Sequence, residues 1–266
     1  MPELPEVETV TRSLQVIKGQ SIEGFEVSPL VLRLQEYLAQ DVVGQKIRSI
    51  ERRGKFIVMS LSASRYLVVH LGMSGRLFLS PPDEPLAKHT HAVLTTHEKK
   101  QVRYFDPRRF GGVWLTFDPV NVVGNLGPEP LSPEFTEKHL TDKLSTRKIA
   151  IKSLLLDQQV LAGVGNIYAD EALHRAGIKP DRPANSLTRA EISRLYKAII
   201  ETLQLSIEKR GTTFRDYRDG LNQPGGFQDH LLVYGREGKP CHSCGRVLRR
   251  EVIGGRSSHY CEHCQK

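Results

Sequence analysis

The sequence lacks the features of membrane-spanning and exported proteins. Its apolar runs, such as residues 66–69, are far shorter than the roughly 18 to 20 residues of a membrane-spanning helix. The chain starts with Met-Pro-Glu-Leu-Pro-Glu, which places two carboxylates and two prolines where an export signal carries cations and an apolar run. We therefore expect a protein of the cytoplasm that does not associate with membranes.

Cysteine is absent until position 241, and all four cysteines lie within the last 26 residues. They form two Cys-x2-Cys pairs that are sixteen residues apart, which is typical of a four-thiolate zinc site. Two disulfides in an exported tail are the alternative, but the missing export signal argues against them. Because four sulfurs leave no coordination position for water, we predict one structural zinc ion. The predicted ligands are Cys241, Cys244, Cys261 and Cys264.

Acidic residues are too few to balance the basic ones. The chain has 38 Lys and Arg against 30 Asp and Glu, which gives a formal charge of +8. Four thiolates with one zinc ion would lower that charge by about two units. Fixed cations attract phosphates over about a Debye length, so the excess favours a polyanionic partner. Many basic proteins bind no nucleic acid, and charge alone does not identify the partner.

Apolar periodicity divides the chain into two parts, in keeping with a length of 266 residues. Apolar residues at three- and four-residue steps predict an amphipathic helix over residues 6–17. Short β-rich runs with turn signals between them are typical of a sandwich or barrel. The strands are expected at 46–50, 56–61, 66–71, 77–79, 92–96, 102–105 and 113–117.

The second part is predicted to be helical. Residues 124–133 contain three prolines and two glycines, which indicates a connection between domains. Short helices are expected at 152–156 and 166–176, with Gly163 and Gly165 in the turn between them. Thr188 and Glu191 form a predicted capping box for a helix that ends near Lys209. The polar segment 215–226 is predicted to be a mobile loop.

Proline at position 2 becomes the chain terminus once Met1 is removed, which is usual before a small residue. A terminal amine has a pKa of about 7.7 to 8.0, so about a tenth to a fifth is neutral at pH 7. A secondary amine that attacks a sugar C1′ gives an iminium, which makes the C2′ proton removable and permits loss of the 3′ phosphate. Adjacent Glu3 can donate the proton that opens the sugar ring. By itself, an N-terminal proline is usually only a chain start.

Four motifs together resemble those of formamidopyrimidine-DNA glycosylases. They are MPELPEVET at 1–9, DPRRFG at 106–111, GVGNIY at 163–168 and the cysteine ribbon, and they occur in the family's order. The resemblance covers essentially the whole chain. It implies a bifunctional DNA glycosylase and AP lyase of base excision repair. Such an enzyme excises oxidised purines, namely 8-oxoguanine and formamidopyrimidines, through a Pro2 Schiff base followed by β,δ-elimination.

The resemblance also implies an α+β fold. An N-terminal helix and an antiparallel β-sandwich form the expected catalytic domain, residues 1–124, and residues 125–133 form a linker. A helical DNA-binding domain with a helix–two-turn–helix element is expected at 134–228, and the zinc ribbon at 229–266. We expect a monomer that acts on damaged double-stranded DNA in the bacterial cytoplasm, where it associates with the nucleoid.

The resemblance assigns catalytic roles to four residues. Pro2 is the nucleophile and Glu3 the proton donor, while Glu6 supports them. Lys55, which by default would be a solvated charge at a strand end, is implied to assist β-elimination. Arg256 is implied to act in δ-elimination. Because an arginine keeps its proton, we favour phosphate binding as the role of Arg256.

Further residues are implied to open and hold the duplex. An enzyme that attacks C1′ rotates the nucleotide out of the stack, and Met73 would fill the vacancy while Arg108 and Phe110 contact the orphaned base and wedge the next step. For a lone Met or Phe, core packing is the alternative. The implied DNA contacts are completed by His89, Arg108, Arg147, Lys152, Asn166 and Tyr234.

Two alternatives stay open. The endonuclease VIII branch shares the N-terminal chemistry but prefers oxidised pyrimidines, whereas Leu4 follows the purine-directed pattern. A non-catalytic zinc-ribbon protein that only binds DNA is the other alternative. It is disfavoured because the four implied catalytic residues are all present.

Overall fold

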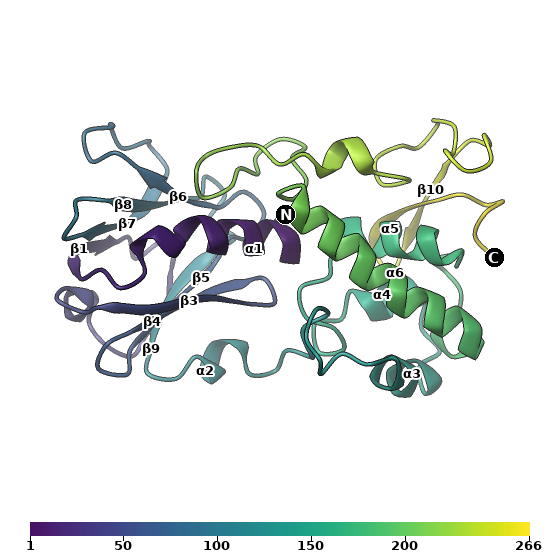
Figure 1. Ribbon diagram of the computed structural model, residues 1–266, viewed down its shortest axis with the longest axis horizontal. Coiled ribbons are helices and arrows are strands. Elements are labelled where there is room, and N and C mark those ends of the chain that lie inside the picture. Colours follow the sequence, from purple (N-terminus) through teal and green to yellow (C-terminus); the bar gives the residue numbers. More distant parts are fainter. The chain divides into compact units, whose positions relative to one another are not determined.

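The computed structural model describes all 266 residues, and the chain divides between two units (Figure 1). Unit 1 comprises Met1–Asn125 and Lys209–Gln228, and unit 2 comprises Leu126–Glu208 and Asp229–Lys266. Residues 209–228 thus belong with the N-terminal unit, whereas the sequence analysis grouped them with the helical domain 134–228. Their hydrogen bonds to the start of the chain, described below, give the physical reason.

Unit 1 is a β-sandwich with an N-terminal helix, as expected. Its sheets have the strand orders β1-β7-β8-β6 and β2-β9-β5-β4-β3, and all pairs are antiparallel except β2 with β9. The elements are α1 (Leu4–Ser13), η1 (Leu14–Ile17), β1 (Ile22–Val27), β2 (Leu32–Gln35), η2 (Ala39–Val42), β3 (Ile47–Arg53), β4 (Phe56–Leu61), β5 (Tyr66–His70), β6 (Arg76–Ser80), β7 (Thr90–Thr96), β8 (Gln101–Phe105), β9 (Gly112–Thr116) and α2 (Val120–Val123).

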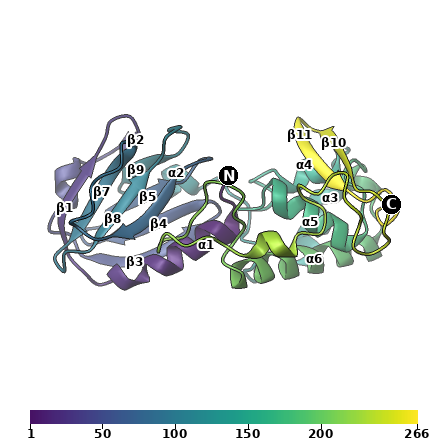
Figure 2. The same ribbon diagram turned by 90° about the horizontal axis from the view of Figure 1, so that it is seen from above.

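The core of unit 1 lies between its two sheets and under α1. Every second residue of β4 is buried, as is expected of a strand with one face on the core. The predicted helix over 6–17 is α1 followed by the 3-10 turn η1, and its apolar residues Val7, Val10, Leu14 and Ile17 are all buried. Helix α1 packs on β3, β4 and β6, which fixes the start of the chain against the sandwich, and Figure 2 shows α1 beside β3 and β4.

Unit 2 consists of four main helices and a two-stranded ribbon. Helix α6 packs on α3 and α5, and strand β11 packs on α5. Thr188 N–H donates to Glu191 Oε2 at 2.8 Å, so the predicted capping box is present at α6. The elements are α3 (Glu137–Ser145), α4 (Ile151–Leu155), α5 (Asn166–Ala176), η3 (Ala184–Ser186), α6 (Arg189–Glu208), β10 (Arg249–Ile253) and β11 (Arg256–Tyr260), and η4 (Phe227–His230) joins the units in sequence.

Strands β1 and β2 and helix α3 are among the elements that the sequence did not predict. A register shift between Ile22 and Gly24 in β1 breaks the alternation that marks a strand. Strand β2 lies at a sheet edge, and none of its side chains is fully buried. Helix α3 buries only two leucines, and it begins where Thr136 accepts the His139 N–H at 3.1 Å. None of the helices has both the length and the apolar character needed to cross a membrane.

Candidate functional site

The start of the chain is fixed by one carboxylate. Pro2 and Glu3 are buried directly before α1. Glu3 N–H donates to Glu6 Oε2 at 2.8 Å, as in a capping box. The other oxygen of Glu6, Oε1, accepts the Thr212 N–H at 2.7 Å. Glu6 therefore holds the backbone beside Pro2 and joins it to the 209–228 segment. Because Met1 precedes Pro2, the Pro2 nitrogen becomes an amine only after Met1 is removed.

The 209–228 segment is anchored to α1 by further contacts. Tyr217 is buried, and its hydroxyl oxygen lies 3.1 Å from the Arg210 carbonyl and 3.3 Å from the Glu6 carbonyl, which share its single O–H as acceptors. Gly211 has φ +79°, and a Cβ there would lie 2.8 Å from Glu6 Oε1, so only glycine fits. The loop expected at 215–226 contains no helix or strand, and its mobility stays a prediction.

Lys55 lies in a protected position at the turn between β3 and β4. It is mostly buried, and Gly54 with φ +56° makes the turn before it. His70 pairs across the sheet with Phe56, the residue after Lys55, and lies close enough for the charge of Lys55 to act on it. Burial, assisted by the charge of Lys55, lowers the pKa of His70 to about 4. The neutral His70 accepts the Gly72 N–H on Nδ1 at 3.1 Å, and so supports the turn that carries Met73.

The lowered pKa of His70 makes stability depend on pH. Between the ordinary pKa of 6.5 and about 4, the unfolded chain takes up a proton that the folded chain rejects, so stability falls as pH falls through this range. The variant H70N keeps an acceptor for Gly72 and should lose this contribution, about 3 kcal/mol between neutral pH and pH 4. Urea unfolding at several pH values measures it, and identical pH profiles for H70N and the parent protein would contradict it.

Met73, Arg108 and Phe110 project from two loops of unit 1. Met73 is 43% exposed and Phe110 is 62% exposed, so neither is a core residue. Arg108 lies 3.4 Å from Asp216 in an exposed ion pair. Such pairs contribute about 0–1 kcal/mol, so Arg108 can exchange Asp216 for another anion at little cost. These three side chains are accessible to a macromolecular partner.

Asp106 joins these two loops and Arg33 holds one of them, and the sequence revealed neither role. The fully buried Asp106 carboxylate accepts Ser74 Oγ–H at 2.7 Å from the Met73 loop and Gly111 N–H at 2.9 Å from its own loop. Arg33 donates to the carbonyls of Arg109 at 2.6 Å and Gly111 at 2.8 Å. Because most of these contacts join residues far apart in the sequence, no periodic pattern in the sequence indicates them.

The variant D106N should loosen both loops. An amide offers one acceptor oxygen in place of two, and its NH2 group would meet a backbone or hydroxyl donor. We expect a loss of about 1–3 kcal/mol in unfolding free energy and faster amide hydrogen exchange at Gly111. The exposed variant D216N serves as the control. Unchanged exchange at Gly111 in D106N would show that the carboxylate does not join the loops.

The other residues predicted to contact DNA lie outside these two loops. His89 is half-buried next to the Asp106 loop, since its carbonyl accepts the Asp106 N–H at 3.0 Å. In unit 2, Arg147 is exposed after α3, where its carbonyl accepts the Asn185 N–H at 3.0 Å. Tyr234 is partly exposed, and its ring meets that of His259 edge-on at 4.8 Å.

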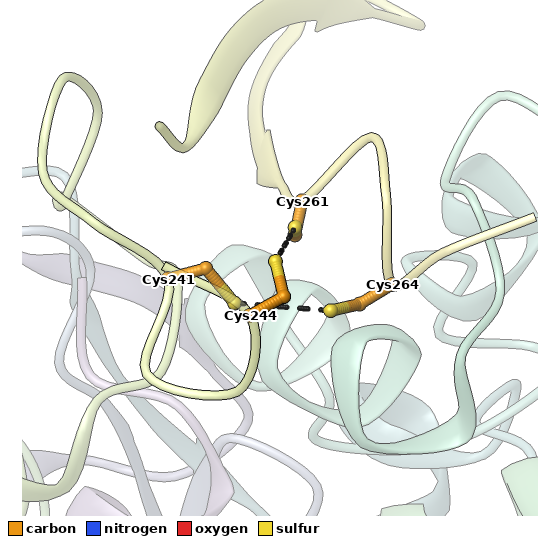
Figure 3. Close-up of side chains that lie close together, drawn as sticks. All are labelled: Cys241, Cys244, Cys261 and Cys264. Atoms are coloured by element: carbon orange, nitrogen blue, oxygen red, sulfur yellow. Dashed lines mark hydrogen bonds between the residues drawn. The ribbon is translucent and has the colours of Figure 1, made fainter. Parts of the chain in front are cut away.

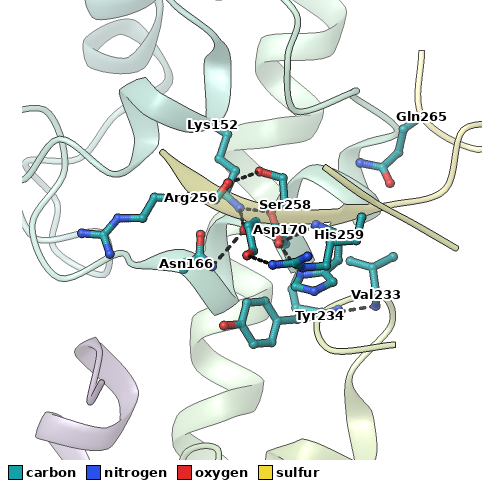
Figure 4. A network of polar contacts seen from close by, with 12 residues as sticks. Lys152, Asn166, Asp170, Val233, Tyr234, Arg256, Ser258, His259 and Gln265 are labelled. Carbon is teal, nitrogen blue, oxygen red and sulfur yellow. Dashed lines mark hydrogen bonds and ion pairs between the residues drawn. The ribbon is translucent and has the colours of Figure 1, made fainter. Parts of the chain in front are cut away.

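The burial of Lys152 argues against the predicted contact of this residue with a phosphate. Its side chain is 0% exposed, its Nζ lies 2.6 Å from Asp170 Oδ1, and Nζ donates to the Ser257 carbonyl at 2.6 Å (Figure 4). A buried ammonium with these partners is not available to a phosphate. Asn166, at the first turn of α5, donates from Nδ2 to the same carbonyl at 3.0 Å. Both side chains thus hold the backbone next to Arg256.

Arg256 itself is exposed at the start of β11. The glycines Gly254 and Gly255 make the preceding turn, with φ +55° and +75°. In Figure 4 the Arg256 side chain points away from the buried network of Lys152 and Asp170. The ribbon therefore presents a guanidinium whose backbone is fixed and whose charged head is accessible.

Two adjacent carboxylates of helix α5 accept hydrogen bonds from the backbone of the C-terminal segment. Asp170 Oδ2 accepts the His259 N–H at 2.9 Å. Glu171 accepts the backbone N–H groups of residues 232–234 at 2.8 to 2.9 Å. Burial raises the pKa of Glu171, and the three N–H groups act against that rise. The C-terminal segment is thereby attached to α5 before the first cysteine pair and again just before the second.

The four cysteines converge at one point (Figure 3). Their sulfurs all lie within 4.8 Å of one another, with 3.9 Å between Cys241 and Cys264 and 3.5 Å between Cys244 and Cys261. Zn–S bonds of about 2.3 Å in a tetrahedron place sulfurs roughly 3.8 Å apart, so the set fits zinc. Disulfide sulfurs would be about 2.0 Å apart, which excludes the disulfide alternative.

The pKa of the Cys241 thiol is lowered, which favours metal binding. Burial acts to raise its pKa, but the backbone N–H groups of Ser243 and Cys244 lower it to about 7. The thiolate, which is the form that binds metal, is therefore accessible near neutral pH.

The fold and the site define a protein with a β-sandwich unit and a helical unit that carries a four-cysteine zinc ribbon. Three family models match: the formamidopyrimidine-DNA glycosylase N-terminal domain at 1–113, its H2TH domain at 126–218, and the zinc finger found in FPG and IleRS at 238–266. The chain belongs to the formamidopyrimidine-DNA glycosylase family. Its four cysteines form the family's structural zinc site.

Individual relatives match this chain over essentially its full length. The formamidopyrimidine-DNA glycosylase of Syntrophomonas wolfei is 49% identical over 100% of both chains. The crystal structure of the MutM (Fpg) protein of Thermus thermophilus has a TM-score of 0.89 and 42% identity, and it covers 99% of this chain and 98% of its own. A Lactococcus lactis FPG mutant in complex with Fapy-dG-containing DNA has a TM-score of 0.93 and 37% identity, with 100% of both chains covered.

Proposed function

We propose that this protein is a bifunctional DNA glycosylase and AP lyase of base excision repair that excises oxidised purines from duplex DNA. The buried Pro2–Glu3 start of the chain, held by Glu6, carries the proposal. The names of its full-length relatives and the Fapy-dG complex of the Lactococcus lactis protein support the substrate class.

The first chemical steps use the chain terminus. With Met1 removed, the neutral Pro2 nitrogen attacks C1′, the bond from C1′ to the base breaks, and the departing base takes up the proton that the Pro2 nitrogen loses. Glu3 donates a proton to the ring oxygen O4′, the C1′–O4′ bond opens, and an iminium joins Pro2 to C1′. Holding the amine beside the sugar is the task of Glu6, because a free chain end is otherwise disordered.

Elimination follows from the iminium. Loss of the C2′ proton moves its electron pair toward the iminium, and the C3′–O bond breaks to release the 3′ phosphate. Lys55 is our candidate for assisting this β-elimination, and its buried position beside His70 keeps it oriented. Arg256 binds the phosphate that leaves C5′ in the δ-elimination, and water then hydrolyses the iminium to free the amine.

Opening of the duplex is assigned to the two locked loops. Met73 would fill the vacancy left by the everted nucleotide, with Arg108 at the orphaned base and Phe110 in the neighbouring step. Asp106 and Arg33 make this a preorganised wedge, so little loop entropy is lost on binding.

Phosphate binding is assigned to a wider set of residues. Lys152 is a positioning residue in this account, because its ammonium is bound to Asp170. The zinc ion held by the four cysteines stabilises the folded ribbon and takes no part in the reaction. The remaining proposed phosphate contacts are His89, Arg108, Arg147, Asn166 and Tyr234.

We also propose that the protein acts as a monomer and associates with the bacterial nucleoid through DNA. The monomer is sufficient because all proposed catalytic residues come from one chain.

Blocking the terminus should separate chemistry from binding. A protein with an uncleaved N-terminal extension keeps Pro2 in a peptide bond, so excision of 8-oxoguanine should fall by about a thousandfold or more. Binding to a duplex with a stable abasic-site analogue should change little, because the extension leaves the loops and the ribbon intact. The same extension carrying a protease site that regenerates Pro2 is the control. Undiminished excision before cleavage would overturn the role of Pro2.

Substrate choice tests the oxidised-purine assignment. Side-by-side cleavage of duplexes that carry 8-oxoguanine, a formamidopyrimidine or an oxidised pyrimidine should give the higher kcat/KM for both purine lesions. A preference for the pyrimidine lesion would favour the endonuclease VIII alternative, and binding without any cleavage would favour the non-catalytic one.

A further inference from the structure

A histidine of helix α5 reaches the zinc site. His174 lies on the last turn of α5 and is buried. Its Nε2 lies 3.7 Å from Cys241 Sγ, which is within hydrogen-bonding distance for sulfur. The other ring nitrogen, Nδ1, is buried and has no hydrogen-bond partner. The ring is thus aimed at one thiol from outside the cysteine set.

His174 is not needed as a zinc ligand. Four sulfurs already complete the tetrahedron, and the four cysteines lie on the ribbon segment while His174 comes from a helix more than sixty residues earlier. A metal-bound thiolate keeps negative charge and accepts N–H groups. A neutral imidazole has one N–H, and placing it on Nε2 gives it an acceptor, whereas placing it on Nδ1 would bury an unpaired donor.

We propose that His174 is a positioning residue of the zinc site, whose Nε2–H donates a hydrogen bond to the Cys241 thiolate and fastens the metal centre to α5. The bond withdraws charge from the sulfur and limits its protonation and its loss from zinc. It differs from the contacts of Asp170 and Glu171, which accept backbone N–H groups and do not touch a cysteine.

The hydrogen bond has a consequence for metal retention. Groups that orient zinc ligands typically change metal affinity by 10- to 100-fold when they are removed. The His174 ring contacts the sulfur of Cys241, so the effect should fall on this ligand. The inference concerns the metal site alone and does not depend on the proposed reaction.

Three variants separate hydrogen bonding from packing. H174F fills the space without a donor, H174Q keeps an amide N–H close to the position of Nε2, and the exposed neighbour variant R175A is the control. Each folded protein is loaded with zinc, and transfer of zinc to a chromogenic chelator is followed. We expect H174F to lose zinc about 10- to 100-fold more readily, and H174Q and R175A to stay within a few-fold of the parent protein.

Two outcomes would overturn the inference. If H174F retains zinc as well as the parent protein, the hydrogen bond has no role in the site. If H174Q loses zinc as readily as H174F, packing rather than donation is responsible.

A measurement on the unaltered zinc-loaded protein covers the case in which H174F does not fold. ¹⁵N NMR of histidine-labelled protein should show His174 as the Nε2–H tautomer, with that proton protected from exchange. An Nδ1–H tautomer would overturn the inference. Cobalt substitution should give the spectrum of four-sulfur coordination, and a spectrum with nitrogen coordination would also overturn it, since His174 would then be a ligand.

Discussion

The carboxylate of Glu6 makes the contacts on which the proposed chemistry at the chain start depends. One oxygen holds the Glu3 backbone and the other holds Thr212, so a single buried group fixes both the terminus and the 209–228 segment. Chain ends are ordinarily mobile, yet a nucleophile must be placed to within about half an ångström. Gly211 is required beside it because a Cβ would meet the same carboxylate. In the proposed reaction, the placement of the Pro2 amine therefore rests on this contact.

Unit 2 uses buried polar groups in the same way. Asp170 and Glu171 take up backbone N–H groups of the C-terminal segment, and Lys152 neutralises Asp170 while it holds the Ser257 carbonyl. Buried charges are tolerated only when they are paired, and each of these has a partner. The exposed Arg256 thus lies on a ribbon that is held by its zinc site and by the contacts of its backbone with Asp170 and Lys152.

Local patterns predicted much of this protein, and distant contacts account for the rest. Cysteine spacing predicted the zinc ligands, and apolar periodicity with flanking glycines predicted α5 at its observed bounds. Lys152 in a short helix has the local signature of a solvated cation, and only its pairing with Asp170 on α5 reveals its burial. The roles of Asp106 and Arg33 likewise depend on loops that meet only in the folded chain. Motif resemblance supplied the roles of Pro2 and Lys55, which no periodicity could indicate.

The central claim is that the Pro2 nitrogen, freed of Met1, forms the covalent bond to the damaged nucleotide. The most direct test is borohydride reduction of the protein during its reaction with a duplex that carries 8-oxoguanine, followed by proteolysis and tandem mass spectrometry of the DNA-linked peptide. We expect a sugar adduct on the terminal nitrogen of a peptide that begins at Pro2. An adduct on a lysine side chain such as that of Lys55, or no adduct despite strand cleavage, would contradict it.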